Sequence, residues 1–390
     1  MGTHKPKLNR FQKGLYGFLY ATVAPIYRRI IHYTPQDLSQ AQPPYLVLAN
    51  HNLTLDPVAV ACAFKQPMCF VASDHLQRKG LLTWLLNACF GIISRRKGTV
   101  AYTTALEILR TLRQGDSVCL FAEGNRSFTG KTMPILPSTG ALAKKAGVPV
   151  YTYKIEGAYL AHPRWAKYLR RGKIQGHLVN KYTPEQLKEM SVDEVNAHIL
   201  EDLREDAHAR QAADPVRYRG KRRAESLETI LFLCPCCGQI GRLKSRGNTL
   251  ACACGARAVY TEYGTLEGDM PFSTEEEWDQ WQEAELRTMA AAPGDAPILQ
   301  DGAVTLTQLD SGNQVLYQHT GPIAFTAAAL RAGERELPVE AISDMSIYGR
   351  NTIVFTCGDD YYEVKGDKTF CGRKYDQLYR ILREAPQRSC

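Results

Sequence analysis

Short apolar runs alternate with helical stretches along the first half of the chain. Four runs have the length and composition of buried strands, at residues 45–49, 69–72, 117–121 and 148–155. Helical stretches begin at Val58 and cover residues 81–90, 103–112 and 141–146. This alternation predicts an α/β layer around a mostly parallel sheet. Ligands of such sheets bind at the carboxyl ends of the strands.

The last part of the chain has a different pattern. From residue 301 to 365, apolar and polar positions alternate, with Gly and Asp between the runs. This predicts an antiparallel sheet, and residues 375–383 predict a closing helix. The combination resembles a pleckstrin-homology-like barrel. That resemblance implies either a site for lipid headgroups or a plain scaffold, because fold alone does not assign function.

The segments between these two patterns give the expected domain organisation. A basic run at residues 217–223 follows a charged helical stretch, and five cysteines lie between Cys234 and Cys254. Residues 273–276 read as a capping box that opens a short helix, and residues 290–297 read as a linker. The predicted units are an N-terminal helix region (1–44), an α/β domain with its basic linker (45–225), a cysteine-rich unit (226–270), a helical linker (271–297) and a β-rich unit with a C-terminal helix (298–390).

The N-terminal region predicts a helix at a membrane interface. Basic residues precede an uncharged run at residues 14–27, which contains Pro25 and ends at Arg28 and Arg29. The run is shorter than the roughly 20 residues that a spanning helix needs. Aromatic residues at headgroup depth and basic residues on phosphates suit a helix that lies in the interface. A helix packed on the domain is the alternative.

Composition narrows the class of protein. The chain has 390 residues, with 44% hydrophobic and 23% charged residues, which is typical of folded domains. The formal net charge is +8, which favours anionic partners without choosing among phosphates, acidic lipids and nucleic acid. Twelve cysteines, five of them clustered, indicate a metal site in a reducing compartment rather than a disulfide framework.

His51 and Asp56 are the candidate catalytic pair. His51 lies just after the first predicted strand, and Asp56 opens the following helix, where it is expected to act as the N-cap. A turn between them can bring the carboxylate to the imidazole. The carboxylate would then fix the tautomer and stabilise the imidazolium. The imidazole could remove a proton from an alcohol.

A second group of candidates would bind the substrate. Glu123, Gly124 and Arg126 follow the third strand: the Arg can bind phosphate oxygens, the Glu can accept hydrogen bonds from a hydroxyl or orient the Arg, and the Gly allows close backbone approach. Arg95 and Arg96 follow an apolar helix and could meet a phosphate or an anionic acyl carrier. Bilayer contact is the alternative for these two arginines.

The order of these blocks resembles the glycerol-phosphate and lysophospholipid acyltransferase family. The resemblance covers roughly residues 46–156 and rests on His51 with Asp56, residues 91–96, residues 121–127 and residues 148–150. It implies direct attack of an acceptor hydroxyl on an acyl thioester, either acyl-CoA or acyl-acyl-carrier-protein, with His51 as base. The chain departs from the family pattern at Ala122, at Leu53 and in residues 134–140. The last two departures leave the acceptor and its headgroup open.

The clustered cysteines resemble a zinc ribbon. Two Gly-containing turns carry Cys234 with Cys237 and Cys252 with Cys254, and these four thiolates predict a structural, tetrahedral Zn²⁺ site. Cys236 is left over. An iron–sulfur site is the alternative, although a tight antiparallel ribbon suits Zn²⁺ better.

The sequence therefore predicts an acyltransferase of phospholipid synthesis. Its acceptor would be a lysophospholipid such as 1-acyl-sn-glycerol-3-phosphate. Its place would be the cytoplasmic face of a membrane, as a peripheral or monotopic protein, with an acyl carrier protein as a further candidate partner. The alternative is a zinc-ribbon adaptor on an inactive acyltransferase scaffold. Nucleic acid is a poor candidate partner because the ribbon lacks a dense basic and aromatic face.

Overall fold

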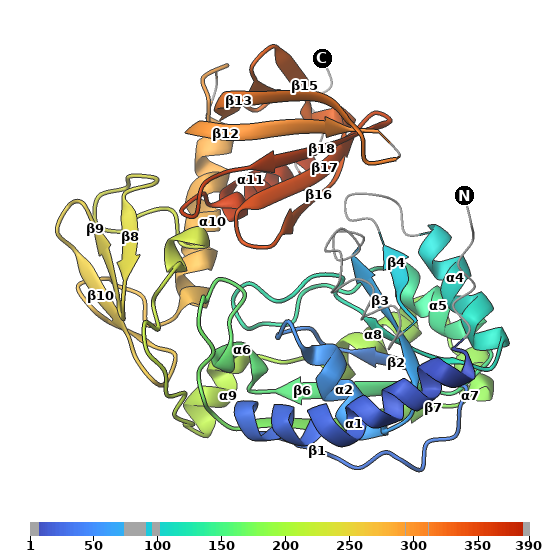
Figure 1. Ribbon diagram of the computed structural model, residues 1–390. Helices are drawn as coiled ribbons and strands as arrows, with labels where there is room; N and C mark the ends of the chain where they lie inside the picture. Colours follow the sequence, from blue (N-terminus) through green and yellow to red (C-terminus); the bar gives the residue numbers. More distant parts are fainter. Residues whose placement is uncertain (1–7, 74–90, 96–101, 293, 311, 385–390) are drawn as a thin grey trace.

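The computed structural model describes residues 8–73, 91–95, 102–292, 294–310 and 312–384. These residues form three sheets (Figure 1). The predicted helix at residues 81–90 and the predicted ligand Arg96 lie outside the described residues.

The first sheet is the expected mostly parallel α/β sheet. Its order is β1-β7-β6-β2-β5-β3-β4. All described pairs are parallel except β6 with β7. The sequence pattern did not reveal β1, β4 and β7. The strands are β1 (Tyr33–Pro35), β2 (Leu46–Ala49), β3 (Met68–Ser73), β4 (Ile93–Arg95), β5 (Ser117–Phe121), β6 (Val150–Glu156) and β7 (Ile174–Tyr182).

Helices cover both faces of this sheet, as the apolar run of β2 requires. Val47 and Ala49 belong to a core with residues of α1 and α2, whereas Leu46 and Leu48 belong to a core with residues of α4, α5 and α8. Successive strand residues point to opposite faces, so β2 is buried on both. The helices are α1 (Arg10–Ile31), α2 (Asp56–Phe64), α4 (Tyr102–Arg113), α5 (Ser138–Lys145), α6 (Ala158–Ala161), α7 (Pro184–Glu189), α8 (Val192–Leu203) and α9 (Ala207–Ala213).

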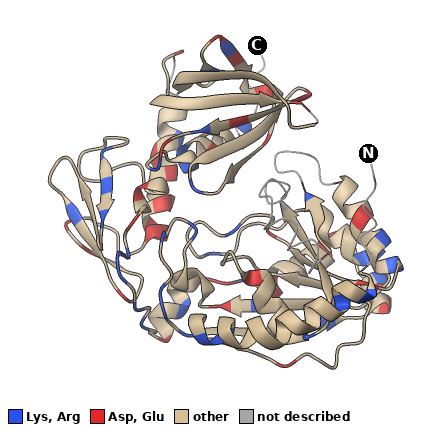
Figure 2. Cartoon of the chain, in the orientation of Figure 1, with Lys and Arg blue, Asp and Glu red and all other residues tan. Residues whose placement is uncertain are grey.

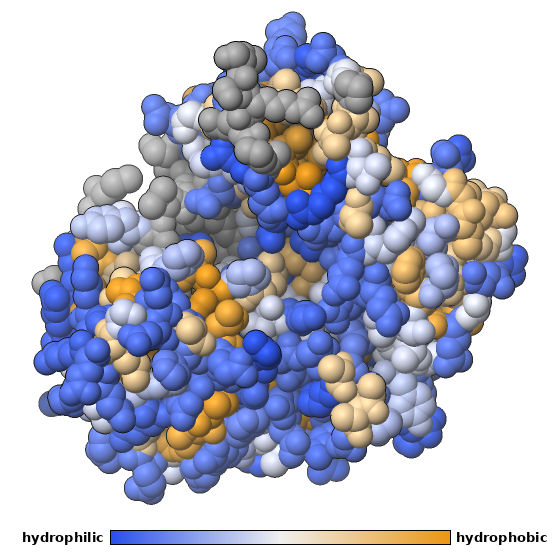
Figure 3. Space-filling view, turned by 180° about the vertical axis from the view of Figure 1, so that it is seen from behind, coloured by the Kyte–Doolittle hydropathy of each residue, from blue (hydrophilic) through white to orange (hydrophobic). Residues whose placement is uncertain are grey.

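Helix α1 packs on the domain with one face and is apolar on another. Tyr16, Ala24, Tyr27 and Ile31 are buried, and α1 contacts α2 and β1. Its exposed hydrophobic side chains are Phe11, Phe18, Val23, Ile26 and Ile30. Among the described residues, no helix is both long and apolar enough to cross a bilayer. On the opposite side of the molecule, hydrophilic residues predominate and hydrophobic ones form separate patches (Figure 3).

The cysteine-rich segment forms a small antiparallel sheet. Its order is β11-β10-β9-β8, with β8 (Leu243–Arg246), β9 (Thr249–Cys252), β10 (Arg257–Tyr260) and β11 (Leu266–Gly268). Helix α10 (Glu275–Ala291) follows. Its capping box pairs Thr274 with Glu277, one residue later than predicted, and the helix continues into the expected linker. Acidic residues are concentrated on α10 (Figure 2).

The C-terminal unit is a seven-stranded antiparallel sheet closed by a helix. Its order is β15-β14-β13-β12-β18-β17-β16, so two meanders join where β12 pairs with β18. Helix α11 (Gly372–Glu384) packs on β16 and β17, as expected for a β-rich unit with a closing helix. The strands are β12 (Leu299–Leu309), β13 (Val315–Phe325), β14 (Ala329–Ala332), β15 (Arg335–Pro338), β16 (Ile342–Tyr348), β17 (Thr352–Cys357) and β18 (Asp360–Lys365).

The ribbon and the C-terminal sheet share one hydrophobic core. Cys234, Trp278 of α10 and Tyr375 of α11 belong to it, as do Phe128 and Trp165 from the first unit. An ion pair of 2.9 Å between Arg373 and Asp279 also joins α11 to α10. The predicted domain boundaries stay a prediction. The cysteine-rich unit and the β-rich unit nevertheless pack together through α10.

Candidate active site

The predicted His51–Asp56 pair is formed at the carboxyl end of β2. The turn after the strand folds back, so that Asp56 Oδ2 accepts hydrogen bonds from the backbone N–H groups of Asn52 (2.7 Å) and Leu53 (2.8 Å). The same oxygen lies 2.9 Å from His51 Nδ1. Asp56 is the first helical residue and Leu55 is the N-cap, so the expected capping role of Asp56 is wrong. Its carboxylate reaches back to the turn instead of forward into the helix.

This geometry defines which ring nitrogen of His51 faces the substrate. A carboxylate oxygen that already accepts two N–H bonds can only accept, so Nδ1 is the donor to Asp56. Nε2 therefore presents its lone pair. The ring also stacks on Phe121, with centroids 4.4 Å apart, and its side chain is 21% exposed whereas Asp56 is fully buried. The arrangement is compatible with the predicted role of His51 as a general base, which stays a prediction.

Glu123 holds the backbone of His51 rather than facing the cavity. Ala49 and Phe121 are opposite each other in the parallel pair of β2 with β5, so His51 and Glu123 both follow two residues later. Glu123 Oε1 accepts from the His51 N–H (2.7 Å) and Oε2 from the Met133 N–H (2.8 Å). Burial raises the pKa of Glu123 to about 8, although both N–H donors lower it. This geometry favours a positioning role; the substrate-binding role stays a prediction.

Replacing Glu123 by Gln should therefore lower kcat with little change in KM. The amide nitrogen cannot accept, so one N–H bond is lost and the His51 backbone can shift. A displacement of about 1 Å can cost up to a hundredfold in rate. Steady-state kinetics on E123Q should show that kcat loss, with the exposed variant E189Q as control. A rise in KM at unchanged kcat would instead support contact between Glu123 and the substrate.

A cavity of about 310 Å³ opens beside His51. One part of its wall is apolar, and three arginines contribute the cationic part. Arg95 closes one side; a Cβ on Gly124, which has φ +68°, would lie 2.7 Å from Arg95 Nη1. Gly124 thus makes room for that guanidinium as well as lining the cavity. The apolar lining residues are Pro57, Val71, Ala72, Leu120 and Phe121, and the arginines are Arg95, Arg126 and Arg164.

Three lining residues lie beyond residues 46–156, and the sequence analysis gave no sign that they reach the site. Arg164 follows the segment that resembles the family, and Tyr348 and Gly349 come from the C-terminal sheet. An Arg among His, Pro and Trp carries no motif, and a Tyr-Gly pair reads only as a turn. Because they approach the site through tertiary packing, local pattern could not place them.

Part of the chain is similar to known proteins. Residues 30–156 match the family model described as Acyltransferase. This segment is therefore an acyltransferase-family domain. The chain is also similar to the "Probable 1-acyl-sn-glycerol-3-phosphate acyltransferase" of Mycoplasma genitalium (32% identity over 121 residues, 30% of this chain and 45% of the relative) and to that of Mycoplasma pneumoniae (28% over 139 residues, 33% and 50%).

The chain spans about half the length of these curated relatives. Among solved structures, it is similar to the 1-acyl-sn-glycerophosphate acyltransferase PlsC from Thermotoga maritima. That likeness has a TM-score of 0.41 and 19% identity, and it covers 50% of this chain and 82% of the other.

Outside the acyltransferase domain, the four predicted cysteine ligands come together. The Sγ atoms of Cys234, Cys237, Cys252 and Cys254 all lie within 4.8 Å of one another. Two of the separations are 3.9 Å (Cys234 to Cys254) and 3.7 Å (Cys237 to Cys252). Tetrahedral Zn²⁺ with Zn–S bonds of about 2.3 Å needs sulfurs about 3.8 Å apart. The cluster therefore fits a metal such as zinc, which would cross-link the two turns.

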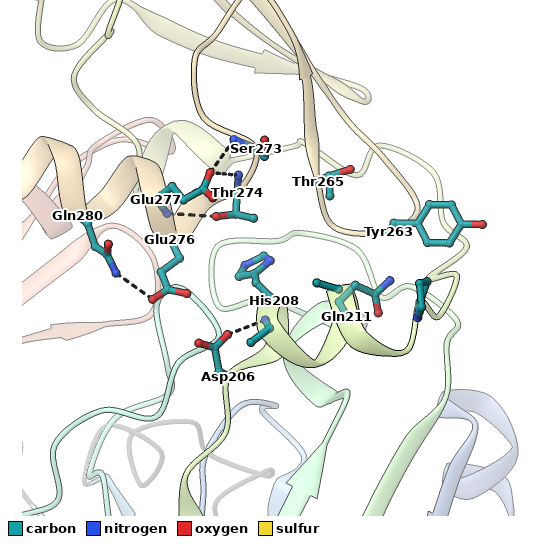
Figure 4. A pocket seen from close by; sticks show the side chains of 13 residues that line it. Asp206, His208, Gln211, Tyr263, Thr265, Ser273, Thr274, Glu276, Glu277 and Gln280 are labelled. Atoms are coloured by element: carbon teal, nitrogen blue, oxygen red, sulfur yellow. Dashed lines mark hydrogen bonds between the residues drawn. The ribbon is translucent and has the colours of Figure 1, made fainter.

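A larger cavity, of about 730 Å³, lies where α9 meets the ribbon and the start of α10. It shares no lining residue with the cavity of the acyltransferase domain. Figure 4 shows that several of its polar groups cap helices: Glu277 accepts from the N–H groups of Ser273 and Thr274, and Asp206 accepts from Ala209. These hydrogen bonds stabilise the N-terminal ends of α9 and α10.

Proposed function

We propose that the acyltransferase domain transfers an acyl chain from a thioester to a hydroxyl of 1-acyl-sn-glycerol-3-phosphate. The observation that carries this proposal is the position of the His51–Asp56 pair at a cavity with both an apolar and a cationic wall. An acyl chain suits the apolar wall, and guanidinium groups suit a phosphate. The names of the two Mycoplasma relatives support the same acceptor.

The proposed reaction is one direct displacement. His51 Nε2 takes the proton of the acceptor hydroxyl while its oxygen attacks the thioester carbonyl, and Asp56 stabilises the resulting imidazolium. The C–S bond then breaks, and the imidazolium returns the proton to the departing thiolate. The products are the ester and the free thiol of coenzyme A or of the acyl carrier protein. Glu123 keeps the His51 backbone in place throughout.

The test is an assay of the full chain with lysophosphatidate and either acyl-CoA or acyl-acyl-carrier-protein. The expected product is phosphatidate, with a clear preference for one donor. Parallel reactions use lysophosphatidylcholine and glycerol 3-phosphate as acceptors. Absence of transfer to any of the three would contradict the proposal and favour the adaptor alternative.

We place this reaction at the cytoplasmic face of a membrane, with α1 in the interface. The hydrophobic side chains that α1 exposes would enter the acyl boundary, and basic residues lie toward both of its ends (Figure 2). Thioester donors of both kinds are cytoplasmic. The described cysteines are all free thiols, which agrees with a reducing compartment.

Membrane binding should weaken when the exposed face of α1 is made polar. Burying one large apolar side chain stabilises by about 1.5–3 kcal/mol, so F18D/I26D should reduce binding by at least tenfold. Sedimentation with vesicles of phosphatidylglycerol and phosphatidylcholine measures this. The control is V315D/L316D, which changes two exposed apolar residues of β13. Equal vesicle binding by the two double variants would contradict the placement of α1 in the membrane interface.

A further inference from the structure

The turn between β16 and β17 reaches the cavity of the acyltransferase domain. Tyr348 and Gly349, at the end of β16, line the same cavity as His51. In Figure 1 these two strands form the edge of the C-terminal sheet that faces the acyltransferase domain. A segment almost 300 residues away in sequence from His51 thus forms part of the wall of its pocket.

Specific polar contacts hold this turn in place. Asn125, between Gly124 and Arg126, donates to Ser346 Oγ at 3.2 Å. Arg164 donates to the Ile347 carbonyl through Nη2 and to the Arg126 carbonyl through Nη1. Ser346 of β16 therefore contacts the loop that follows β5, and the next residue, Ile347, contacts Arg164, which follows α6. The cavity wall thus continues from one unit into the other.

The contact between the β16–β17 turn and the acyltransferase domain brings several guanidinium groups close together. Arg350, in the turn, and Arg164 line one small cavity, and Arg164 also lines the larger one with Arg126. Burial, together with the nearby Arg126, lowers the pKa of Arg164 to about 9. Burial, together with Arg350, lowers the pKa of Arg126 to about 10. Such repulsion between cations is relieved by an anion.

Nearby protein groups do not supply that anion. Arg126 Nη1 is buried and has no hydrogen-bond partner among the described residues. The carboxylates that act on these arginines are Asp56 and Asp376. Asp56 is engaged by His51, and Asp376 by Arg373 and Arg380. Arg126 lines the cavity, so its unpartnered guanidinium N–H is a donor that a ligand oxygen could satisfy.

We propose that the β16–β17 turn completes the acceptor site, and that Arg350, with Arg126 and Arg164, binds the phosphomonoester of the acceptor. The proposal rests on the acyl transfer proposed above and adds a specificity role for the C-terminal sheet. A phosphomonoester dianion has the charge and the oxygen count to engage more than one guanidinium. An acceptor without the phosphate would leave these arginines unpaired.

The experiment uses the full chain and the variant R350Q. KM for lysophosphatidate should rise about tenfold, the loss of one charge-assisted hydrogen bond. The KM of the acyl donor should stay unchanged, as should turnover of monoacylglycerol, which lacks the phosphate. R350K should keep most of the affinity because it retains the charge. The matched control is R331Q, which removes an exposed arginine of the same sheet.

A binding measurement separates this inference from the acyl transfer. Calorimetric titration with sn-glycerol 3-phosphate should show binding by the wild type and R331Q, and about tenfold weaker binding by R350Q. If no acyl transfer occurs but this dependence on Arg350 holds, the phosphate site stands and the proposed function fails. Equal KM and equal binding in R350Q and R331Q would overturn the inference. So would absence of binding in the wild type, or a rise confined to the donor's KM, which would assign the phosphate to the donor.

Discussion

Replacing His51 by alanine is expected to lower kcat for acyl transfer by roughly 10²–10⁴. Nε2 of this ring is the proposed base for the acceptor hydroxyl, because Nδ1 is occupied by Asp56. The stacked Phe121 and the fixed backbone keep the ring in place. Alanine removes the base but leaves the cavity lined by other residues, so KM values should change little. Initial rates with saturating donor and acceptor measure the loss.

Two further variants serve as a comparison and as a control for H51A. D56N keeps the size and the oxygen at the position that accepts the N–H bonds, but it removes the charge that stabilises the imidazolium. It should therefore lose activity, though less than H51A. H198A is the control, since His198 is an exposed residue of α8 and alanine is a good helix former. Full activity in H51A would exclude the catalytic assignment.

Much of the candidate active site could be predicted because its residues are tied to strand ends. The apolar run before His51 predicts a buried strand, and parallel pairing places residues after β2 and β5 at one edge. The spacing of five residues allows a single turn to join His51 to Asp56. These rules depend only on neighbouring residues, so they can be applied to a sequence without a structure. Whether Glu123 turns toward the cavity or toward the backbone depends on the course of the loop that contains Met133, which no local pattern records.

The rest of the site depends on packing between units. Tyr348 reaches the cavity because the C-terminal sheet packs on the loop after β5 and on Arg164, through contacts between residues about 180–220 positions apart. The strands β1, β4 and β7 were also missed. The edge strands β1 and β4 have only three residues each, too few to show a hydrophobic period. In β7 buried and exposed residues do not alternate regularly, so the hydrophobic period of 2 is weak. The one-residue shift of the α10 cap reflects two neighbouring hydroxyl residues that could each serve as N-cap.

Zinc analysis of the full chain should find about one ion per molecule, and the ion should be lost in C252S. The four sulfurs already have the separations of a tetrahedral site, and each ligand contributes a thiolate. Loss of a structural ion should cost about 5 kcal/mol or more, since such sites bind zinc with about 10–16 kcal/mol. The corresponding fall in Tm is about 10–20 °C. C236S is the control: Cys236 is exposed and its sulfur contacts Met270 rather than the cluster.

The effect of zinc loss should extend beyond the ribbon. Trp278 of α10 donates to the Leu233 carbonyl at 2.9 Å, directly before Cys234, and Cys371, next to α11, donates to Thr229 at 3.0 Å. The metal would therefore fix the segment on which α10 and α11 rest, and α11 packs on the strands that carry Arg350. We expect C252S to raise KM for lysophosphatidate at temperatures where the acyltransferase domain stays folded. No zinc in freshly purified, reduced protein would refute the ribbon assignment. Zinc loss without a change in KM would show that the turn holds its place independently of the metal.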